Sequence, residues 1–407
     1  MKTIAKILFA YTCLFSSLLH AQNKDQSYSP FQSGIKESIT SKVLGEQREF
    51  WIQVPENAKP YERFPVVYVL DGEEQMTGLM AVHHYYWGHY LPKMILVGIA
   101  NKQHRDRDLT PSKLKGMETG EAEKFTEFIE KELIPYIDSN YPTTSYRTLI
   151  GHSHAGLYTT HVFVNHTDLF SNYIAIDPSL YWDNQKFHKN SIQKLDKLSP
   201  AKKTLFISLA SPLDRSDESI GIDEVLKTES PHSLLARSTL TFCNAIEYKH
   251  FENFRFRWKY YPEDIHGSVP LSTMIDALRF SFAWYQLKDA SKFNDPSTSI
   301  DTLEAMLNER AMVLTNHFGY PMPPAGEDLL TMGAEMYTYM EQMNKAKLFF
   351  GLAAEHYPES ETAQRNLADY YHQNNELDKA VKYLTLAYKI SGNKTHLEKI
   401  EEIKSRD

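Results

Sequence analysis

The sequence is poor in cysteine and carries no excess of positive charge. Its 407 residues include two cysteines, Cys13 and Cys243, and the first lies in an N-terminal segment that we expect to be removed. A single remaining cysteine excludes an internal disulfide, so a hydrophobic core must stabilise the fold. Asp and Glu outnumber Lys and Arg by 52 to 44, and no basic stripe occurs, which argues against a nucleic-acid partner.

The first residues have the features of a secretory signal. Lys2 and Lys6 precede an apolar run over residues 7–19, and the small residue Ala21 follows shortly after. This is the charged start, apolar middle and small-residue cleavage site of a signal peptide. The run is too short to span a bilayer comfortably. We therefore expect residues 1–21 to be cleaved and the mature protein to be periplasmic or secreted, without stable membrane insertion.

Short apolar segments alternate with amphipathic ones between residues 22 and 290. "FPVVYVL" and "MILVGIA" are continuous apolar runs typical of strands buried on both faces, and "GEAEKFTEFIEKELIPYIDSNY" has a helical period. The segments "YRTLIG", "NYIAID", "KTLFISLA" and "RFRWKYYP" are further expected strands. This alternation predicts an α/β fold with a doubly wound, mostly parallel sheet.

The strand pattern is lost after residue 290, where helix-forming residues dominate. We expect a helical linker over 291–325 and a small all-α unit over 326–407. The segment from Asn344 aligns with the segment from Asp378 at an offset of 34 residues. This period is typical of tetratricopeptide repeats, which commonly bind proteins. A protein partner is therefore an expectation for this unit.

The stretch "TLIGHSHAGLY", residues 148–158, surrounds one serine with small residues between an expected strand and an expected helix. This is the context of the nucleophile elbow G-x-S-x-G, whose tight turn requires small neighbours and exposes the serine hydroxyl. Gly151 and Gly156 fit the turn, and Ala155 replaces the second glycine of the strict pattern. The helix that follows supplies N–H groups and a favourable dipole. Ser153 is therefore the candidate nucleophile.

A serine hydroxyl needs a base, which lies late in the chain order Ser, acid, His. His266 follows an expected strand and precedes the closing helix, so it is the candidate base. The acid should follow "TLFISLA", and Asp214 lies nearest to the end of that strand. Other carboxylates stay open by position, the last of them at the end of the preceding strand: Asp217, Glu218, Asp223 and Asp177. A Ser–His pair without a strong acid also stays open.

The segment "FIEKELIPYIDSNYPTTSYRTLIGHSHAGLYTTHVFVNHTDLFSNYIAIDPSLYWDN" resembles an esterase family of the α/β-hydrolase superfamily. That family includes esterase D, enterochelin-type siderophore esterases, feruloyl esterases and mycolyltransferases. "VYVLDGEE" is similar to its oxyanion loop, "NKQHRDRDLTP" to a segment of its predicted-hydrolase branch, and "DPSLYWD" to its Ser-Pro-Ser-Leu-Trp-Trp run. Asp177 and Tyr181 depart from that run, and His154 and Ala155 from the usual elbow Gly-His-Ser-Leu-Gly-Gly.

The resemblance implies an α/β-hydrolase fold in which Ser153 is the nucleophile and His266 the general base. The backbone N–H groups of His154 and Glu73 would form the oxyanion hole, and Gly72 would let the chain turn there. No metal or organic cofactor is expected, because the histidine pairs of this chain lack zinc-ligand spacing. Aromatic residues are the candidates for substrate binding: Tyr86, Trp87, Tyr181 and Trp182.

The expected activity is hydrolysis of a small-molecule carboxylic ester through an acyl-enzyme. A siderophore lactone, an acylated sugar, a feruloyl ester and a lipid-like ester all fit. Two alternatives stay open. An acyltransferase would use the same residues with an alcohol in place of water. A non-catalytic interaction protein would keep the fold as a scaffold and use its helical repeats.

Overall fold

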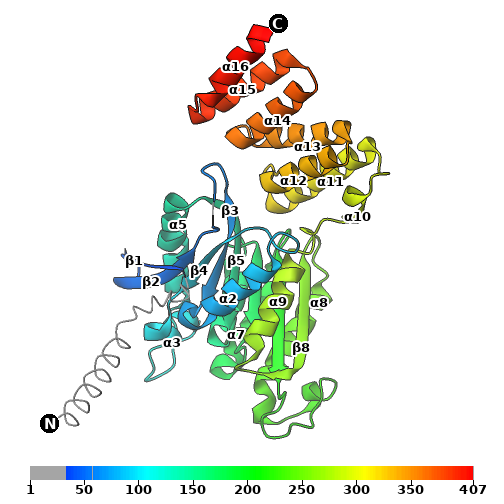
Figure 1. Cartoon of the computed structure of the whole chain (residues 1–407). Coiled ribbons are helices and arrows are strands. Elements are labelled where there is room, and N and C mark those ends of the chain that lie inside the picture. Colours follow the sequence, from blue (N-terminus) through cyan, green and yellow to red (C-terminus); the bar gives the residue numbers. More distant parts are fainter. Residues whose placement is uncertain (1–33, 57, 407) are drawn as a thin grey trace, which may run out of the picture.

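The structure is a computed structural model that describes residues 34–56 and 58–406 (Figure 1). The expected signal peptide, residues 1–21, lies outside the described residues. The sheet has the strand order β1-β2-β4-β3-β5-β6-β7-β8. Its strands are β1 (Ile35–Ser41), β2 (Glu46–Gln53), β3 (Phe64–Leu70), β4 (Ile95–Ile99), β5 (Thr143–His152), β6 (Asn172–Ile176), β7 (Thr204–Ser211) and β8 (Arg255–Ile265).

The sheet is mostly parallel, as the alternation of segments predicts. β1 pairs with β2, and β2 with β4, in antiparallel register, and every other neighbouring pair is parallel. All seven residues of β3 and all five of β4 and of β6 are buried. Strands of this kind require helices on both faces of the sheet.

Helices connect the parallel strands and cover both faces of the sheet. They are α2 (Gly72–Tyr86), η1 (Lys102–His104), α3 (Arg105–Leu109), α4 (Ala122–Phe128), the π-helical turn η2 (Ile129–Leu133), α5 (Ile134–Asn140), α6 (His154–Asn165), α7 (Trp182–Lys194), η3 (Leu195–Lys197), η4 (Val225–Lys227), η5 (Pro231–Ser233), α8 (Leu234–Lys249) and α9 (Val269–Ser281). The helix expected over residues 120–141 is thus α4 and α5 joined by η2.

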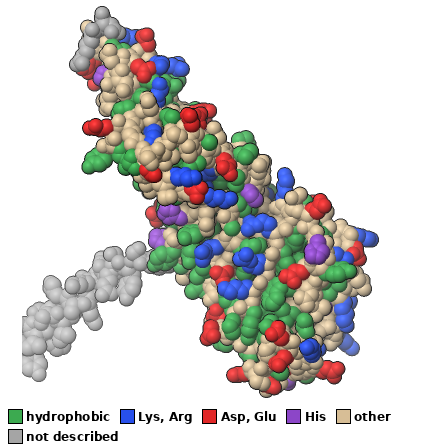
Figure 2. Space-filling view, turned by 90° about the vertical axis from the view of Figure 1, so that its right-hand side faces the viewer, with side chains coloured by type: hydrophobic (Ala, Val, Ile, Leu, Met, Phe, Trp, Pro, Cys, Tyr) green, Lys and Arg blue, Asp and Glu red, His purple; other side chains and the backbone are tan. Residues whose placement is uncertain are grey.

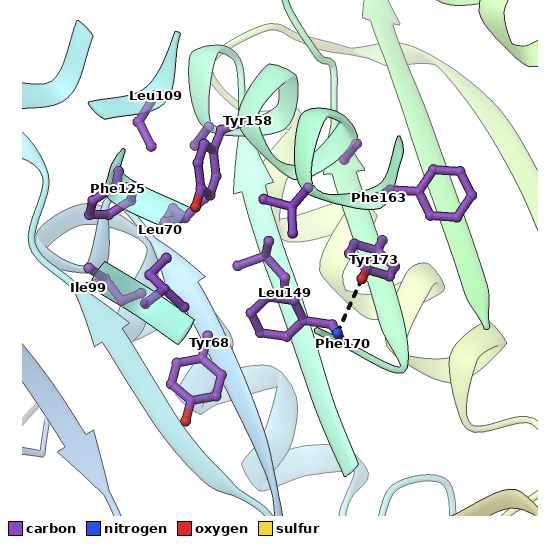
Figure 3. Close-up of a cluster of buried hydrophobic side chains, with 14 of the residues drawn as sticks. Tyr68, Leu70, Ile99, Leu109, Phe125, Leu149, Tyr158, Phe163, Phe170 and Tyr173 are labelled. Carbon is purple, nitrogen blue, oxygen red and sulfur yellow. Dashed lines mark hydrogen bonds between the residues drawn. The ribbon is translucent and has the colours of Figure 1, made fainter. Parts of the chain in front are cut away.

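The alternation of side chains along β3 divides the core into two clusters. Tyr68 and Leu70 point to one face, where they belong to one cluster with Phe125 of α4 and Tyr158 of α6 (Figure 3). The intervening residues of β3 point to the other face, which is covered by α2 and α9. Both helix layers therefore depend on the period of two in a buried strand.

Residues beyond α9 form a separate helical layer. Its helices are α10 (Ser291–Asn294), α11 (Ile300–Phe318), α12 (Glu327–Tyr339), α13 (Met343–His356), α14 (Glu361–Gln373), α15 (Leu377–Ser391) and α16 (Thr395–Arg406). α12 and α14 begin 34 residues apart, and so do α13 and α15. The period agrees with the alignment of the sequence, and the assignment to tetratricopeptide repeats stays a prediction. We call α11–α16 the helical arm, which projects from the rounded sheet domain (Figure 2).

The helical arm is attached at the edge where the parallel strands begin. Phe318 of α11 packs on Tyr146 near the start of β5, with ring centroids 5.0 Å apart. Lys59, which precedes β3, forms an ion pair with the buried Glu327 of α12 at 2.7 Å. Residues that end the strands lie at the other edge, away from the arm (Figure 1).

Within the described ranges, no helix combines the length and the apolar character that crossing a membrane requires.

Candidate active site

Ser153 occupies a strained turn between β5 and α6. Its backbone angles are φ 61° and ψ −116°, a conformation that non-glycine residues rarely adopt. A Cβ at Gly151 would lie 2.1 Å from the carbonyl oxygen of Ala155, and one at Gly156 would lie 3.0 Å from that of Ile176. Only small residues therefore fit beside the serine, which explains the composition of the stretch and exposes the hydroxyl.

His266 reaches the serine from the loop between β8 and α9. Its Nε2 lies 3.1 Å from Oγ of Ser153, within hydrogen-bond distance. The ladder between β7 and β8 pairs Ala210 with Tyr261 and then Ser211 with Ile265, so three extra residues of β8 bulge just before the histidine. The structure thus brings the expected nucleophile and the expected base together.

Asp177, not Asp214, contacts the imidazole. Oδ2 of Asp177 lies 2.5 Å from Nδ1 of His266, and its Oδ1 accepts a hydrogen bond from the N–H of Ala210 at 3.1 Å. Asp177 is 2% exposed and has a φ of 40°, so the backbone at the end of β6 is itself unusual. The carboxyl group is therefore held in one orientation against the histidine.

The preference for Asp214 is wrong because its side chain belongs to a local turn. Its carboxylate accepts hydrogen bonds from the N–H and the hydroxyl of Ser216, at 2.8 and 2.7 Å. The hydroxyl groups of Ser216 and Ser230 lower the pKa of Asp214 to about 2. Closeness to the end of β7 is thus a poor guide. The departure of Asp177 from the Ser-Pro-Ser run was the better signal in the sequence.

Two residues beside the serine were not expected from the sequence. Ser179 is buried, its Oγ lies 3.4 Å from Oγ of Ser153, and its N–H donates to the carbonyl of Ser153 at 3.1 Å. His152 packs its ring 4.5 Å from that of His266. Burial, followed by the charge of His266, lowers the pKa of His152 to about 4. His152 is therefore neutral near pH 7 and presents an uncharged ring to the base.

The residues expected to form an oxyanion hole begin two neighbouring helices. β3 pairs with β5, so α2 with Glu73 and α6 with His154 start at the same edge of the sheet. Gly72 is required there, because a Cβ would lie 2.4 Å from the backbone of Gly98. Both N–H groups lie in first helical turns, where they have no helical acceptor. Their use as oxyanion donors stays a prediction.

Arg105 links the ends of β3 and β5. Its guanidinium donates to both carboxylate oxygens of Asp71, at 2.9 and 2.8 Å, and to the carbonyl of His152 at 3.3 Å. Asp71 follows β3 and His152 ends β5, so one side chain fixes the spacing of the two turns. A bidentate arginine pair is well suited to this because its geometry is rigid.

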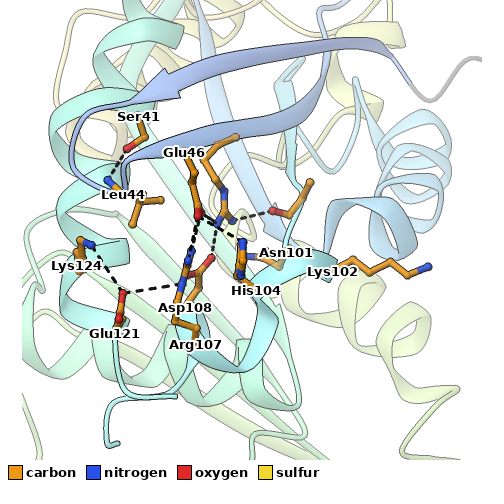
Figure 4. Close-up of polar contacts among 12 residues, drawn as sticks. Ser41, Leu44, Glu46, Asn101, Lys102, His104, Arg107, Asp108, Glu121 and Lys124 are labelled. Atoms are coloured by element: carbon orange, nitrogen blue, oxygen red, sulfur yellow. Dashed lines mark hydrogen bonds and ion pairs between the residues drawn. The ribbon is translucent and has the colours of Figure 1, made fainter. Parts of the chain in front are cut away.

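A buried polar network anchors the segment that carries Arg105 (Figure 4). Arg107 binds Glu46 of β2 at 2.6 Å, and the fully buried Asp108 accepts from Arg48 at 2.5 Å. Hydrogen bonding to Arg107 lowers the pKa of Glu46 to about 2. The "NKQHRDRDLTP" segment is thus bound to the edge of the sheet, which positions Arg105.

Of the aromatic residues expected to bind substrate, Trp182 contacts His154, the residue that follows the serine, and Tyr181 directly precedes α7, which begins with Trp182. Trp182 is 8% exposed, and its ring centroid lies 4.9 Å from that of His154. Nδ1 of His154 lies 2.8 Å from Oδ1 of Asp106, which fixes the imidazole between the acid and the indole. These side chains form a wall of the site directly beyond the nucleophile.

Tyr86 and Trp87 are not in the site, so this expectation is wrong. Tyr86 is the last residue of α2 and Trp87 follows it. The helix begins beside the site and runs about 22 Å away from it at 1.5 Å per residue. Trp87 lies instead under Lys93, 5.7 Å from the ring centroid, and Lys93 lies 3.9 Å from Asp328 of the helical arm. The direction of the helix, which the composition of the segment does not reveal, separates these aromatics from Ser153.

The fold agrees with comparisons to known proteins. Residues 41–219 match the family model "Putative esterase". The ferri-bacillibactin esterase BesA of Bacillus subtilis is 31% identical over 156 residues, which are 33% of this chain and 54% of that protein. The siderophore triacetylfusarinine C esterase of Aspergillus fumigatus is 28% identical over 136 residues, 30% of this chain and 46% of that protein. The chain thus spans about half the length of these relatives.

A crystal structure described as an IroE-like serine hydrolase from Shewanella oneidensis extends the likeness. It has a TM-score of 0.64 and 27% identity, and the match covers 79% of this chain and 99% of that chain. The fold is therefore of the α/β-hydrolase class, with a helical region after the sheet domain. These relatives are described as esterases or as a hydrolase.

Proposed function

We propose that the protein is a serine hydrolase that cleaves a carboxylic ester through an acyl-enzyme. One observation carries the proposal: Oγ of Ser153, both ring nitrogens of His266 and Oδ2 of Asp177 form a continuous series with spacings of 3.1 and 2.5 Å. This arrangement activates a hydroxyl that is otherwise a poor nucleophile. The match to an esterase family model supports it.

The roles of the three residues follow from their contacts. With Nδ1–H donated to Asp177, Nε2 of His266 is free to take the proton of Ser153 as Oγ attacks the ester carbonyl. The oxyanion of the tetrahedral intermediate is stabilised by the N–H groups of His154 and Glu73. His266 then gives the proton to the leaving alcohol, and the acyl group stays on Ser153. Water attacks the acyl-enzyme in the same manner and releases the acid.

The substrate proposed is a small-molecule ester, and the siderophore esters named in two relatives are the first to test. Trp182 and His154 supply an aromatic wall beside Ser153. Nε1 of Trp182 is buried and makes no hydrogen bond within the residues that the structure describes, so it is available to a bound acceptor. Removal of residues 1–21 and a periplasmic or secreted location belong to the same proposal.

The test is active-site labelling of residues 22–407 with a fluorophosphonate, followed by mass spectrometry. An adduct on Ser153 in the wild type that is absent in Ser153→Ala and His266→Ala is the expected result. The same proteins are then assayed on a panel of siderophore, aryl and acyl-sugar esters. A folded wild-type protein that neither labels nor hydrolyses any ester would overturn the proposal. Products formed with an added alcohol would reveal acyl transfer.

A further inference from the structure

A second cluster of polar side chains lies on the far part of α6, away from Ser153. His161 is on α6, His166 follows its last residue, and Glu123 is in the first turn of α4. Nε2 of His161 lies 3.2 Å from Oε1 of Glu123, and Nε2 of His166 lies 2.8 Å from Oε2. The three ligand atoms are all within 4.8 Å of one another. His161 is seven positions beyond the first residue of α6, about 11 Å along the axis.

The geometry of His161 differs from that of a simple ion pair. The side chain is 5% exposed, yet its Nε2 makes no hydrogen bond in the described part of the chain. At 3.2 Å from Oε1 it is near enough to form one, so the ring is not aligned with the oxygen. When a tetrahedral metal is bound through bonds of about 2.0–2.1 Å, its ligand atoms lie about 3.3 Å apart. Each ligand atom then points at the metal and not at another ligand. Leaving such a nitrogen unpaired is otherwise costly.

We propose that Glu123, His161 and His166 bind a divalent transition metal of the zinc type. Two imidazoles and one carboxylate are borderline ligands that suit Zn²⁺ or Co²⁺ better than Mg²⁺ or Ca²⁺. The site is independent of the ester-cleaving residues. It departs from the expectation of a metal-free chain, because His161 and His166 meet Glu123 only through the packing of α6 on α4.

The surroundings allow a metal to enter and one further ligand to bind. Glu123 and His166 line an open hollow of about 480 Å³ together with four charged side chains: Lys124, Glu127, Glu130 and Lys131. Three protein ligands leave a fourth position for water from this hollow.

Asn165 is the residue that would adjust when the metal binds. Its amide Nδ2 donates to the carbonyl of His161 at 2.9 Å and lies 3.1 Å from Nδ1 of the His161 ring. Because an amide N–H faces Nδ1, Nδ1 is the acceptor and the ring proton is on Nε2. Metal binding at Nε2 moves that proton to Nδ1, so the amide must turn its oxygen toward the ring. A carboxylate at this position would accept from Nδ1–H directly, as in other histidine metal sites.

The experiment uses untagged residues 22–407, stripped with a chelator and titrated with Zn²⁺ by calorimetry and with Co²⁺ by visible absorption. One equivalent should bind, Co²⁺ should give the intense bands of a tetrahedral N/O site, and saturating Zn²⁺ should raise the Tm by about 5 °C. His166→Ala and Glu123→Gln should weaken binding at least about 100-fold. Glu127→Gln, which removes a carboxylate from the same hollow, should not. Asn165→Asp should tighten binding by about tenfold.

Two results would overturn the proposal. One is the absence of stoichiometric binding by the folded wild-type protein at 100 μM metal, which would leave an imidazole–carboxylate ion-pair cluster. The other is binding that persists unchanged in both His166→Ala and Glu123→Gln. Because His161 is buried, neither measurement depends on a variant of that residue.

Discussion

Asp177 and His266 are 89 positions apart in the chain, and their side chains meet at 2.5 Å. Asp177 follows β6 and His266 follows β8, so the contact passes over the end of β7, whose Ala210 N–H donates to the same carboxylate. The acid, the base and the nucleophile thus come from three strands that end at one edge of the sheet. This contact predicts that substitution of Asp177 lowers kcat much more than substitution of Asp214.

Asp177→Asn should lower kcat by about 10⁴-fold, because an amide favours the wrong imidazole tautomer and does not stabilise the imidazolium. Asp214→Asn is the matched control, since its carboxylate binds Ser216 while Asp177 binds the imidazole, and it should leave kcat within about threefold. Steady-state kinetics on one ester for both variants provide the measurement. Equal losses in the two would refute the assignment of Asp177.

Gly151→Ala should lower the free energy of unfolding by more than about 2 kcal/mol, because the new Cβ would lie 2.1 Å from the carbonyl oxygen of Ala155. Gly351→Ala serves as the control. It lies within α13 with open space around it, so it should stabilise by about 0.5–1 kcal/mol. Denaturant unfolding of both variants checks the difference, and an unchanged midpoint for Gly151→Ala would contradict the close approach.

Arg105→Lys should lower kcat by about 10- to 100-fold with a smaller change in KM. A lysine cannot reproduce the two bonds to Asp71 together with the bond to His152, so the turns before Glu73 and Ser153 lose their fixed spacing. Arg279→Lys is the control. Arg279 lies over the ring of Tyr86, so its replacement should change neither kcat nor KM. An Arg105→Lys enzyme with wild-type kcat would exclude this linking role.

His188 should make the protein less stable in mild acid. Neither of its ring nitrogens makes a hydrogen bond among the residues described, and burial lowers its pKa to about 4. Since the unfolded value is about 6.5, the unfolded chain binds the extra proton first, and stability falls as the pH drops from about 6.5 to 4. The contribution has a slope of at most about 1.4 kcal/mol per pH unit.

The substitution His188→Leu tests this, because it removes both unpaired nitrogens and the titration. Its free energy of unfolding, measured from pH 7 to 4, should fall less steeply than that of the wild type, while His152 still contributes. Parallel curves for the two proteins would show that His188 does not titrate in this window.

Glu327→Gln should destabilise the protein by about 1–3 kcal/mol and leave kcat unchanged. Its buried carboxylate pairs with Lys59 and accepts hydrogen bonds from Tyr61 and Ser360, so the loss of charge weakens the attachment of the helical arm. The exposed neighbour Asp328 gives the control, and Asp328→Asn should cost less than about 1 kcal/mol. A large loss of kcat in folded Glu327→Gln would mean that the arm influences the site.

The sequence is most informative where a local rule determines the result. Continuous apolar runs predict buried strands, and the small residues around Ser153 predict the elbow because the turn excludes larger ones. Chain order is sufficient to find His266. Each of these inferences uses residues that are close in sequence or an order that the fold class imposes.

Positions that depend on packing are harder to predict. Asp177 acts across β7, and its orientation requires a positive φ that no neighbouring residue indicates. Tyr86 and Trp87 follow an oxyanion-loop segment closely in sequence, yet the length of α2 takes them to the opposite edge. His166 and Glu123 are 43 positions apart, and only the contact between α4 and α6 brings them together.

The attachment of the helical arm where the strands begin gives the molecule two ends that face away from each other. A macromolecule held by the arm would anchor the protein from behind, with the serine turned toward open solvent on the other side. Attachment and ester cleavage would then proceed at the same time without competing for space.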